Sequence, residues 1–194
     1  MNKIISGLAA LFLVSSATFA SAGVWVLDGS ASSISFGSVK KTTVGESHNF
    51  SDLSGGVDAN GNVTVSINLG SVQTNIDVRN ERIIEHVFNG MGMASVAATV
   101  DIQTLEGLET GAITNVMADA TLTLLGSETG FDAPMIAVRL SETRVMLVSD
   151  GMVFLETNDL GIDAGIDILM DLASLPAITR TTPVTVRFVF DLAE

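Results

Sequence analysis

The chain has 194 residues, with 22 acidic and 9 basic side chains, 47% hydrophobic residues and no cysteine. This length allows one ordinary domain, and the hydrophobic content suffices for a sizeable core, which excludes a disordered chain. Without cysteine, zinc ribbons, disulfide scaffolds and thiol chemistry are excluded. The acidic balance argues against nucleic acid as a partner, because phosphates require a basic surface.

The first 22 residues have the anatomy of a secretory signal peptide. Lys3 precedes a short apolar run over residues 4–14, and Ala20-Ser21-Ala22 forms a small-x-small cleavage site. We therefore expect a mature domain of residues 23–194 and a periplasmic location. No later apolar run is long enough to span a bilayer, so stable membrane insertion is not expected.

Apolar and polar residues alternate along much of the mature chain, which is typical of half-buried strands in an antiparallel sheet. Residues 63–69 are the clearest case, because every odd position is apolar and every even position is polar. Similar alternation occurs at residues 34–36, 122–124, 136–140 and 184–190. Turn residues separate about eight such segments, which predicts an all-β fold, an antiparallel barrel of about eight strands.

Two segments break this alternation and predict one or two short helices that cover the barrel. Residues 77–88 place apolar side chains on one side and charged side chains elsewhere, as in an amphipathic helix. Residues 161–175 carry apolar residues at helical spacing, and Pro176 follows as a stop. A barrel of this size can hold one small ligand in its interior.

Several short motifs along the mature chain match those of one known family. They are Trp25-Val26-Leu27-Asp28 with Ser33-Ile34-Ser35-Phe36, residues 69–82 with Val87-Phe88, residues 122–126 with Pro134, residues 158–162, and the closing strand 183–190. Together they resemble the YceI-like family of secreted, lipocalin-like barrels that bind polyisoprenoids. Thr157, Leu160 and Arg82 stand where many members have Arg, Phe and His.

The resemblance implies a periplasmic binding or carrier protein, with no cofactor and no catalysis, whose partner is an isoprenoid or quinone-like lipid. Burial of each methylene group is worth about 0.8 kcal/mol, so a long tail can bind without polar contacts. The expected ligand-binding residues, for each of which ordinary core packing is the alternative, are Phe36, Phe50, Ile83, Ile84, Val87, Phe88, Ile136, Phe188 and Phe190. Trp25 is expected to plug one end of the barrel.

Arg79 is the candidate contact for a lipid headgroup. Its guanidinium group matches phosphate oxygens, and the residue lies within a motif that resembles the family. The alternative is an ion pair with Glu81 or Glu85. For Arg82, an ion pair on the helix surface is the default interpretation.

The other polar patterns in the sequence do not indicate a metal site or a catalytic site. His48 and His86 are far apart in the sequence and neither zinc motif is present, so no metal site is predicted. Residues 45–49 resemble a serine nucleophile elbow but end in asparagine instead of glycine. Three aspartates at helical spacing are interpreted as a solvated face instead of a calcium site: Asp163, Asp167 and Asp171.

The competing hypothesis is an enzyme, or a stress-related module that binds a protein partner, built on the same barrel. An enzyme should gather titratable groups in a concave pocket, and the sequence offers no such cluster. A homodimer is compatible with the sequence, although no interface signature is present.

Overall fold

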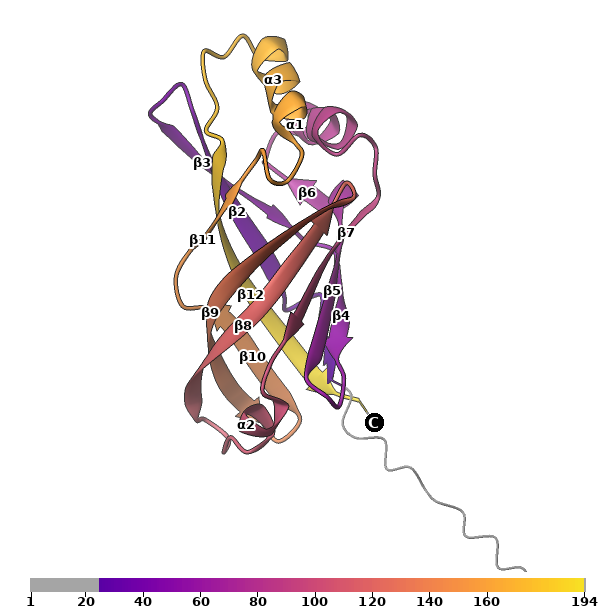
Figure 1. Cartoon of the computed structure of the whole chain (residues 1–194), viewed down its shortest axis with the longest axis vertical. Coiled ribbons are helices and arrows are strands. Elements are labelled where there is room, and N and C mark those ends of the chain that lie inside the picture. Colours follow the sequence, from indigo (N-terminus) through magenta and orange to yellow (C-terminus); the bar gives the residue numbers. More distant parts are fainter. Residues whose placement is uncertain (1–24, 194) are drawn as a thin grey trace, which may run out of the picture.

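The computed structural model describes residues 25–193, and the predicted signal peptide lies outside them. The described chain forms one antiparallel sheet of twelve strands, which closes into a barrel (Figure 1). The strands are β1 (Trp25–Leu27), β2 (Ser33–Lys40), β3 (Val44–Phe50), β4 (Leu53–Val57), β5 (Asn62–Asn68), β6 (Val72–Gln73), β7 (Met93–Thr99), β8 (Ile113–Leu124), β9 (Ser127–Ser141), β10 (Arg144–Ser149), β11 (Val153–Glu156) and β12 (Thr181–Leu192).

Eight strands form the closed ring, in the order β1-β4-β5-β7-β8-β9-β10-β12, and β12 pairs back with β1. This confirms the predicted barrel of eight strands. The clearest predicted strand, residues 63–69, becomes β5, and three of its apolar side chains are buried in the barrel: Val63, Val65 and Ile67. Alternation therefore places the core inside the ring, as expected for a sheet with one buried face.

Strand β12 organises the remaining strands, because each of its edges pairs with two strands in succession. One edge pairs with β1 and then β2, and the other pairs with β10 and then β11. Strand β2 continues the sheet to β3, and β3 pairs with β6. These additional strands extend the barrel toward the upper end in Figure 1, where two helices lie.

Short helical segments lie at both ends of the barrel (Figure 1). They are the 3-10 turn η1 (Leu69–Ser71), α1 (Asp77–Arg82), the π-helical η2 (Ile83–Val87), α2 (Ile102–Glu106) and α3 (Asp163–Leu172). The predicted helix at residues 77–88 is confirmed as α1 followed by η2, and the one at residues 161–175 is confirmed as the shorter α3. No helix among residues 25–193 is long and apolar enough to cross a membrane.

Helix α2 was not predicted, because it has only five residues and is separated from the end of β7 by only two residues. Its start is nevertheless encoded locally. The side chain of Asp101 accepts hydrogen bonds from the backbone N–H groups of Gln103 and Thr104, which is the usual N-cap arrangement. In Figure 1, α2 lies at the end of the barrel opposite α1 and α3.

Candidate ligand-binding site

A cavity of about 540 Å³ extends from the barrel interior to the end covered by α1 and α3. This volume lies within the range of about 300–1,000 Å³ that is usual for small-molecule sites. Most of the lining side chains are apolar, and they come from the inward positions of the barrel strands together with both helices.

Six of the nine predicted ligand-binding residues line this cavity: Phe36, Phe50, Ile83, Val87, Phe88 and Phe188. Three of them form an aromatic wall. The ring centroids of Phe36 and Phe50 lie 5.3 Å apart and stacked, and those of Phe50 and Phe88 lie 6.0 Å apart. The wall therefore runs from β2 across β3 to the end of η2. Contact between these residues and a ligand stays a prediction.

The placement of Ile136 in the cavity wall was wrong. Its neighbour Met135 lines the cavity, and adjacent residues of a strand point to opposite faces, so Ile136 faces outward on β9. The prediction took Arg139 as an outward polar residue, which set the alternation of the strand one residue out of phase. Arg139 is in fact an inward residue, 9% exposed.

Two further residues of the predicted set also lie outside the cavity lining. Ile84 is half-buried on η2, but its turn of helix presents Ile83 and Val87 to the cavity instead. Phe190 is 2% exposed and packs near Phe188, with ring centroids 6.4 Å apart, beyond the inner end of the cavity. Both predictions were wrong about the cavity, although each residue packs with the hydrophobic core.

The sequence reasoning missed the residues that make room for the cavity. Three neighbouring strands, β7, β8 and β9, place alanines at inward positions where larger side chains would fill the barrel: Ala94, Ala98, Ala118, Ala120 and Ala133. The signal in the sequence is the alternate spacing of alanines, as at Ala118 and Ala120 on β8, but these positions lie outside the segments that were predicted as strands. The predicted site contained only large apolar residues, which line a cavity but do not create it.

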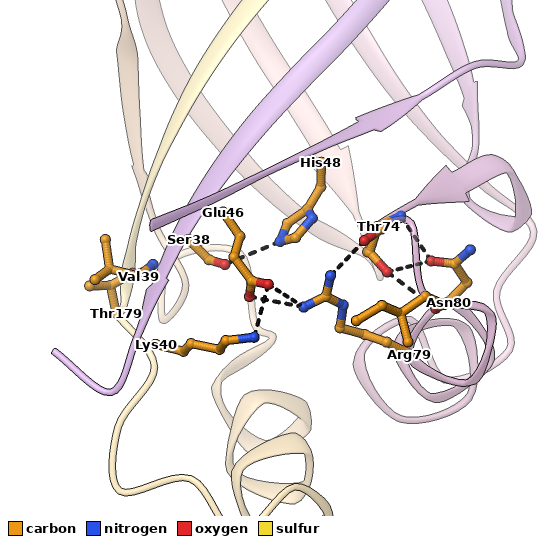
Figure 2. A network of polar contacts seen from close by, with 10 residues as sticks. Ser38, Val39, Lys40, Glu46, His48, Thr74, Arg79, Asn80 and Thr179 are labelled. Carbon is orange, nitrogen blue, oxygen red and sulfur yellow. Dashed lines mark hydrogen bonds and ion pairs between the residues drawn. The ribbon is translucent and has the colours of Figure 1, made fainter. Parts of the chain in front are cut away.

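A polar network lies at the helix-covered end of the cavity (Figure 2). Its centre is Glu46 on β3, whose carboxylate accepts hydrogen bonds from Lys40 Nζ at 2.9 Å and from Arg79 at 2.9 Å to each oxygen. Arg79 also donates to the backbone carbonyl of Thr74 at 2.6 Å. Burial by itself would raise the pKa of Glu46, but these hydrogen bonds hold it below its ordinary value. Glu46 is therefore a permanent anion at neutral pH.

Arg79 thus lines the cavity as predicted, but its expected alternative partners were wrong. Its ion pair is with Glu46 and not with Glu81 or Glu85 on its own helix. Arg82 also lines the cavity, and the expected ion pair on the helix surface does not form within the described residues. Among residues 25–193, the guanidinium group of Arg82 therefore forms no ion pair, although Arg82 was expected to pair on the helix surface.

His48 lies next to this network and is 5% exposed. Its Nε2 lies 3.2 Å from Ser38 Oγ, and its ring lies 5.2 Å from that of Phe36. Burial lowers the pKa of His48, and the charges of Arg79 and Lys40 lower it further against the opposing effect of Glu46. The imidazole is therefore neutral at neutral pH, and it forms the boundary between the aromatic wall and the charged groups.

The other polar patterns do not form reactive sites. No group of three metal-ligating side chains occurs among residues 25–193. Ser47 and His48 are adjacent on β3 and point to opposite faces, so they do not form a nucleophile and base. Two aspartates of the predicted acidic stripe, Asp163 and Asp167, form ion pairs with Arg180.

The opposite end of the barrel is closed by large side chains, in agreement with the expected role of Trp25. Trp25 is 4% exposed, and the guanidinium carbon of Arg139 lies 5.0 Å from the centroid of its ring system. Arg139 also donates to the backbone carbonyls of Leu105 on α2 and of Glu142. Packing of Trp25, Phe190 and α2 leaves space of only about 10 Å³ there.

These features define a lipocalin-like antiparallel barrel that is closed at one end and holds an apolar cavity at the other. No family model and no curated protein sequence matches the chain. A solved polyisoprenoid-binding domain from Saccharophagus degradans, implicated in plant cell wall breakdown, is 37% identical, with a TM-score of 0.84 over 87% of this chain and 98% of that one. This similarity places the chain in the YceI-like family.

Two more distant structures share the fold. Burkholderia cenocepacia BcnA is 13% identical, with a TM-score of 0.64 over 84% of this chain and 98% of that one. A mutant CJ YceI protein with a monobromobimane guest is 12% identical, with a TM-score of 0.54 over 76% of this chain and 84% of that one.

Proposed function

We propose that this protein is a periplasmic carrier that holds an isoprenoid or quinone-like lipid in its barrel and catalyses no reaction. The observation that carries the proposal is the apolar cavity of about 540 Å³, which a barrel of this size would otherwise fill with side chains. The relative that is 37% identical is described as a polyisoprenoid-binding domain, which supports the same class of ligand.

Burial of a prenyl tail supplies enough free energy for binding in such a cavity. At about 0.8 kcal/mol for each methylene group, a few isoprene units offset the cost of association without any polar contact. The aromatic wall of Phe36, Phe50 and Phe88 offers flat apolar surfaces, and the alanine-lined wall gives the tail its space.

The first test is native mass spectrometry of the protein purified from periplasm, followed by organic extraction of any added mass. We expect a prenyl lipid or quinone precursor in the extract, and a mature N-terminus near Gly23. A protein that carries no lipid and also takes up no added prenyl lipid would overturn the carrier function.

Cavity-filling variants test where the lipid lies. Ala118→Phe and Ala120→Phe place a large side chain in the cavity without burying a charge, and we expect each to lose most of the bound lipid while the barrel stays folded. The matched control is Ala97→Phe on the neighbouring β7, because Ala97 is exposed and lies outside the cavity lining. Equal lipid content in all three variants would exclude the cavity as the binding site.

Phe88→Asp tests the contribution of the helix-covered end. Phe88 is 6% exposed and packs against Phe50, so an aspartate there puts a charge into the path of the tail. We expect lipid loading to be abolished, whereas Phe154→Asp, at a side chain that is 63% exposed on β11, should load normally. Circular dichroism of both variants checks that the barrel has formed.

A further inference from the structure

The charged side chains that line the cavity have the opposite balance to the chain as a whole. Five charged residues contribute to the lining, and four are basic: Lys40, Lys41, Arg79 and Arg82, against the single acid Glu46. The full chain has 22 acidic and only 9 basic residues. A positive cavity entrance in an acidic protein points to an anionic binding partner, because opposite charge raises the local concentration of such a ligand.

Two of these four cations share one acidic partner, Glu46, so that group of three keeps a net charge of +1. Glu46 accepts hydrogen bonds from both Lys40 and Arg79 (Figure 2). The other terminal nitrogen of Arg79 donates to the backbone carbonyl of Thr74. An anion placed against Arg79 would also lie against the Glu46 carboxylate. Lys41 and Arg82 have no acidic side chain within 4.0 Å among residues 25–193. Among the described residues of the lining, Lys41 and Arg82 are therefore the two cations without an acidic partner.

The backbone at both cations is held in place by other parts of the fold. The N–H of Lys41 donates to the carbonyl of Ala177 at 3.0 Å, just after the preceding residue, Lys40, forms a bridge with Ile178. Arg82 is the last residue of α1, directly before Ile83, which is 7% exposed in the core. The two free cations thus come from two separate elements, the β2–β3 hairpin and α1, that both line the cavity.

We propose that the lipid carries an anionic headgroup, a phosphate, diphosphate or carboxylate, and that Lys41 and Arg82 bind it at the helix-covered end of the cavity. This inference rests on the carrier function proposed above and adds the headgroup chemistry to it. The planar guanidinium of Arg82 donates to two oxygens of such a group, and Lys41 adds a second positive charge. Glu46 fixes Arg79 and Lys40 and supplies the only negative charge of the lining.

The order of side chains along the cavity matches an amphiphile of this kind. Along β2 and β3 toward their hairpin, the inward side chains change from the aromatic Phe36 and Phe50 to the neutral Ser38 and His48 and then to the charged Lys40 and Glu46. Lys41 follows Lys40 in the hairpin turn, and Arg82 lines the cavity from α1. A tail in the apolar part therefore leaves the headgroup beside the basic groups. A neutral headgroup could accept hydrogen bonds from Lys41 and Arg82 but would lack the attraction between opposite charges.

The experiment compares farnesyl diphosphate with farnesol, which has the same tail and no charge, on the delipidated protein by titration calorimetry. We expect farnesyl diphosphate to bind at least about tenfold more tightly at low salt, with the advantage reduced at high salt. The double variant Lys41→Gln, Arg82→Gln should weaken binding of farnesyl diphosphate to the level of farnesol. The matched control is Arg187→Gln, because Arg187 is exposed on β12 and outside the cavity lining.

The outcomes separate this inference from the carrier function. Equal affinity for the two prenyl compounds in the unmodified protein would overturn the anionic headgroup and leave the carrier function standing. Binding of neither compound would overturn both. Inorganic pyrophosphate serves as a third probe, and if it bound as tightly as farnesyl diphosphate, the basic residues would form a site for free phosphate and the headgroup assignment would fall.

Discussion

The two ends of this barrel are built on the same strands and differ in the size of their inward side chains. At the end beside α2, Trp25, Phe190 and the buried Arg139 fill the interior, and the remaining space is about 10 Å³. At the other end, alanines on β7, β8 and β9 leave a cavity of about 540 Å³. One end of the barrel therefore contributes mainly to stability, and the other end provides the space for a ligand.

The closed end should dominate the free energy of unfolding. Trp25→Ala removes a large buried side chain and the ring beneath Arg139, and we expect the free energy of unfolding to fall by about 3–5 kcal/mol. Urea denaturation measures this change. The control is Val26→Ala on the same strand, 48% exposed, for which we expect a change within about 0.5 kcal/mol. A loss of similar size in both variants would mean that the closed end is not the stable part.

The helix cover of the open end depends on one glycine of α3. A Cβ atom at Gly165 would lie 2.5 Å from the carbonyl oxygen of His86 and 2.6 Å from Cα of Val87, so α3 and η2 approach through their backbones. We expect Gly165→Ala to force these helices apart, to lower stability by about 1–3 kcal/mol and to release lipid faster. Gly45→Ala is the matched control, because no atom lies within 4 Å of its Cβ position.

A thermal unfolding curve together with a lipid-release assay checks this prediction. If Gly165→Ala retained lipid as long as Gly45→Ala does, the close contact between α3 and η2 would have no part in holding the ligand.

The sequence was sufficient for the ring of eight strands, because the alternation of residues 63–69 and 184–190 has a single physical meaning in an antiparallel sheet. It was not sufficient for the interior of the barrel. The inward face of β9 was misassigned because Arg139 is buried by stacking on Trp25, a contact between residues more than a hundred positions apart. The same limit hid the pairing of Arg79 with Glu46, since only the fold brings α1 and β3 together.

The two ends also hold ionisable groups that respond to different ranges of pH. At the closed end, hydrogen bonds from Ser30, Arg144 and the backbone of Ala31 lower the pKa of Asp28 from 3.8 to about 2. Its stabilising effect is present above pH 3.8 and is lost as the pH falls toward 2. At the open end, the folded state holds the pKa of His48 below 6.5, so the unfolded chain takes up this proton first on acidification.

The smallest expected effect is therefore a loss of stability between pH 7.5 and 5 that comes from His48. As the pH falls through 6.5 toward the lowered pKa, His48 binds a proton in the unfolded state but stays neutral in the folded state. The unfolded state is thereby favoured, and the melting temperature decreases. In His48→Gln this decrease should be reduced, whereas Asp28→Asn should keep it and should lose only the decline between about pH 4 and 2. Melting curves measured at half-unit pH steps distinguish the variants. Parallel curves for the unmodified protein and His48→Gln above pH 5 would show that the imidazole at the open end takes up its proton as readily as in the unfolded chain.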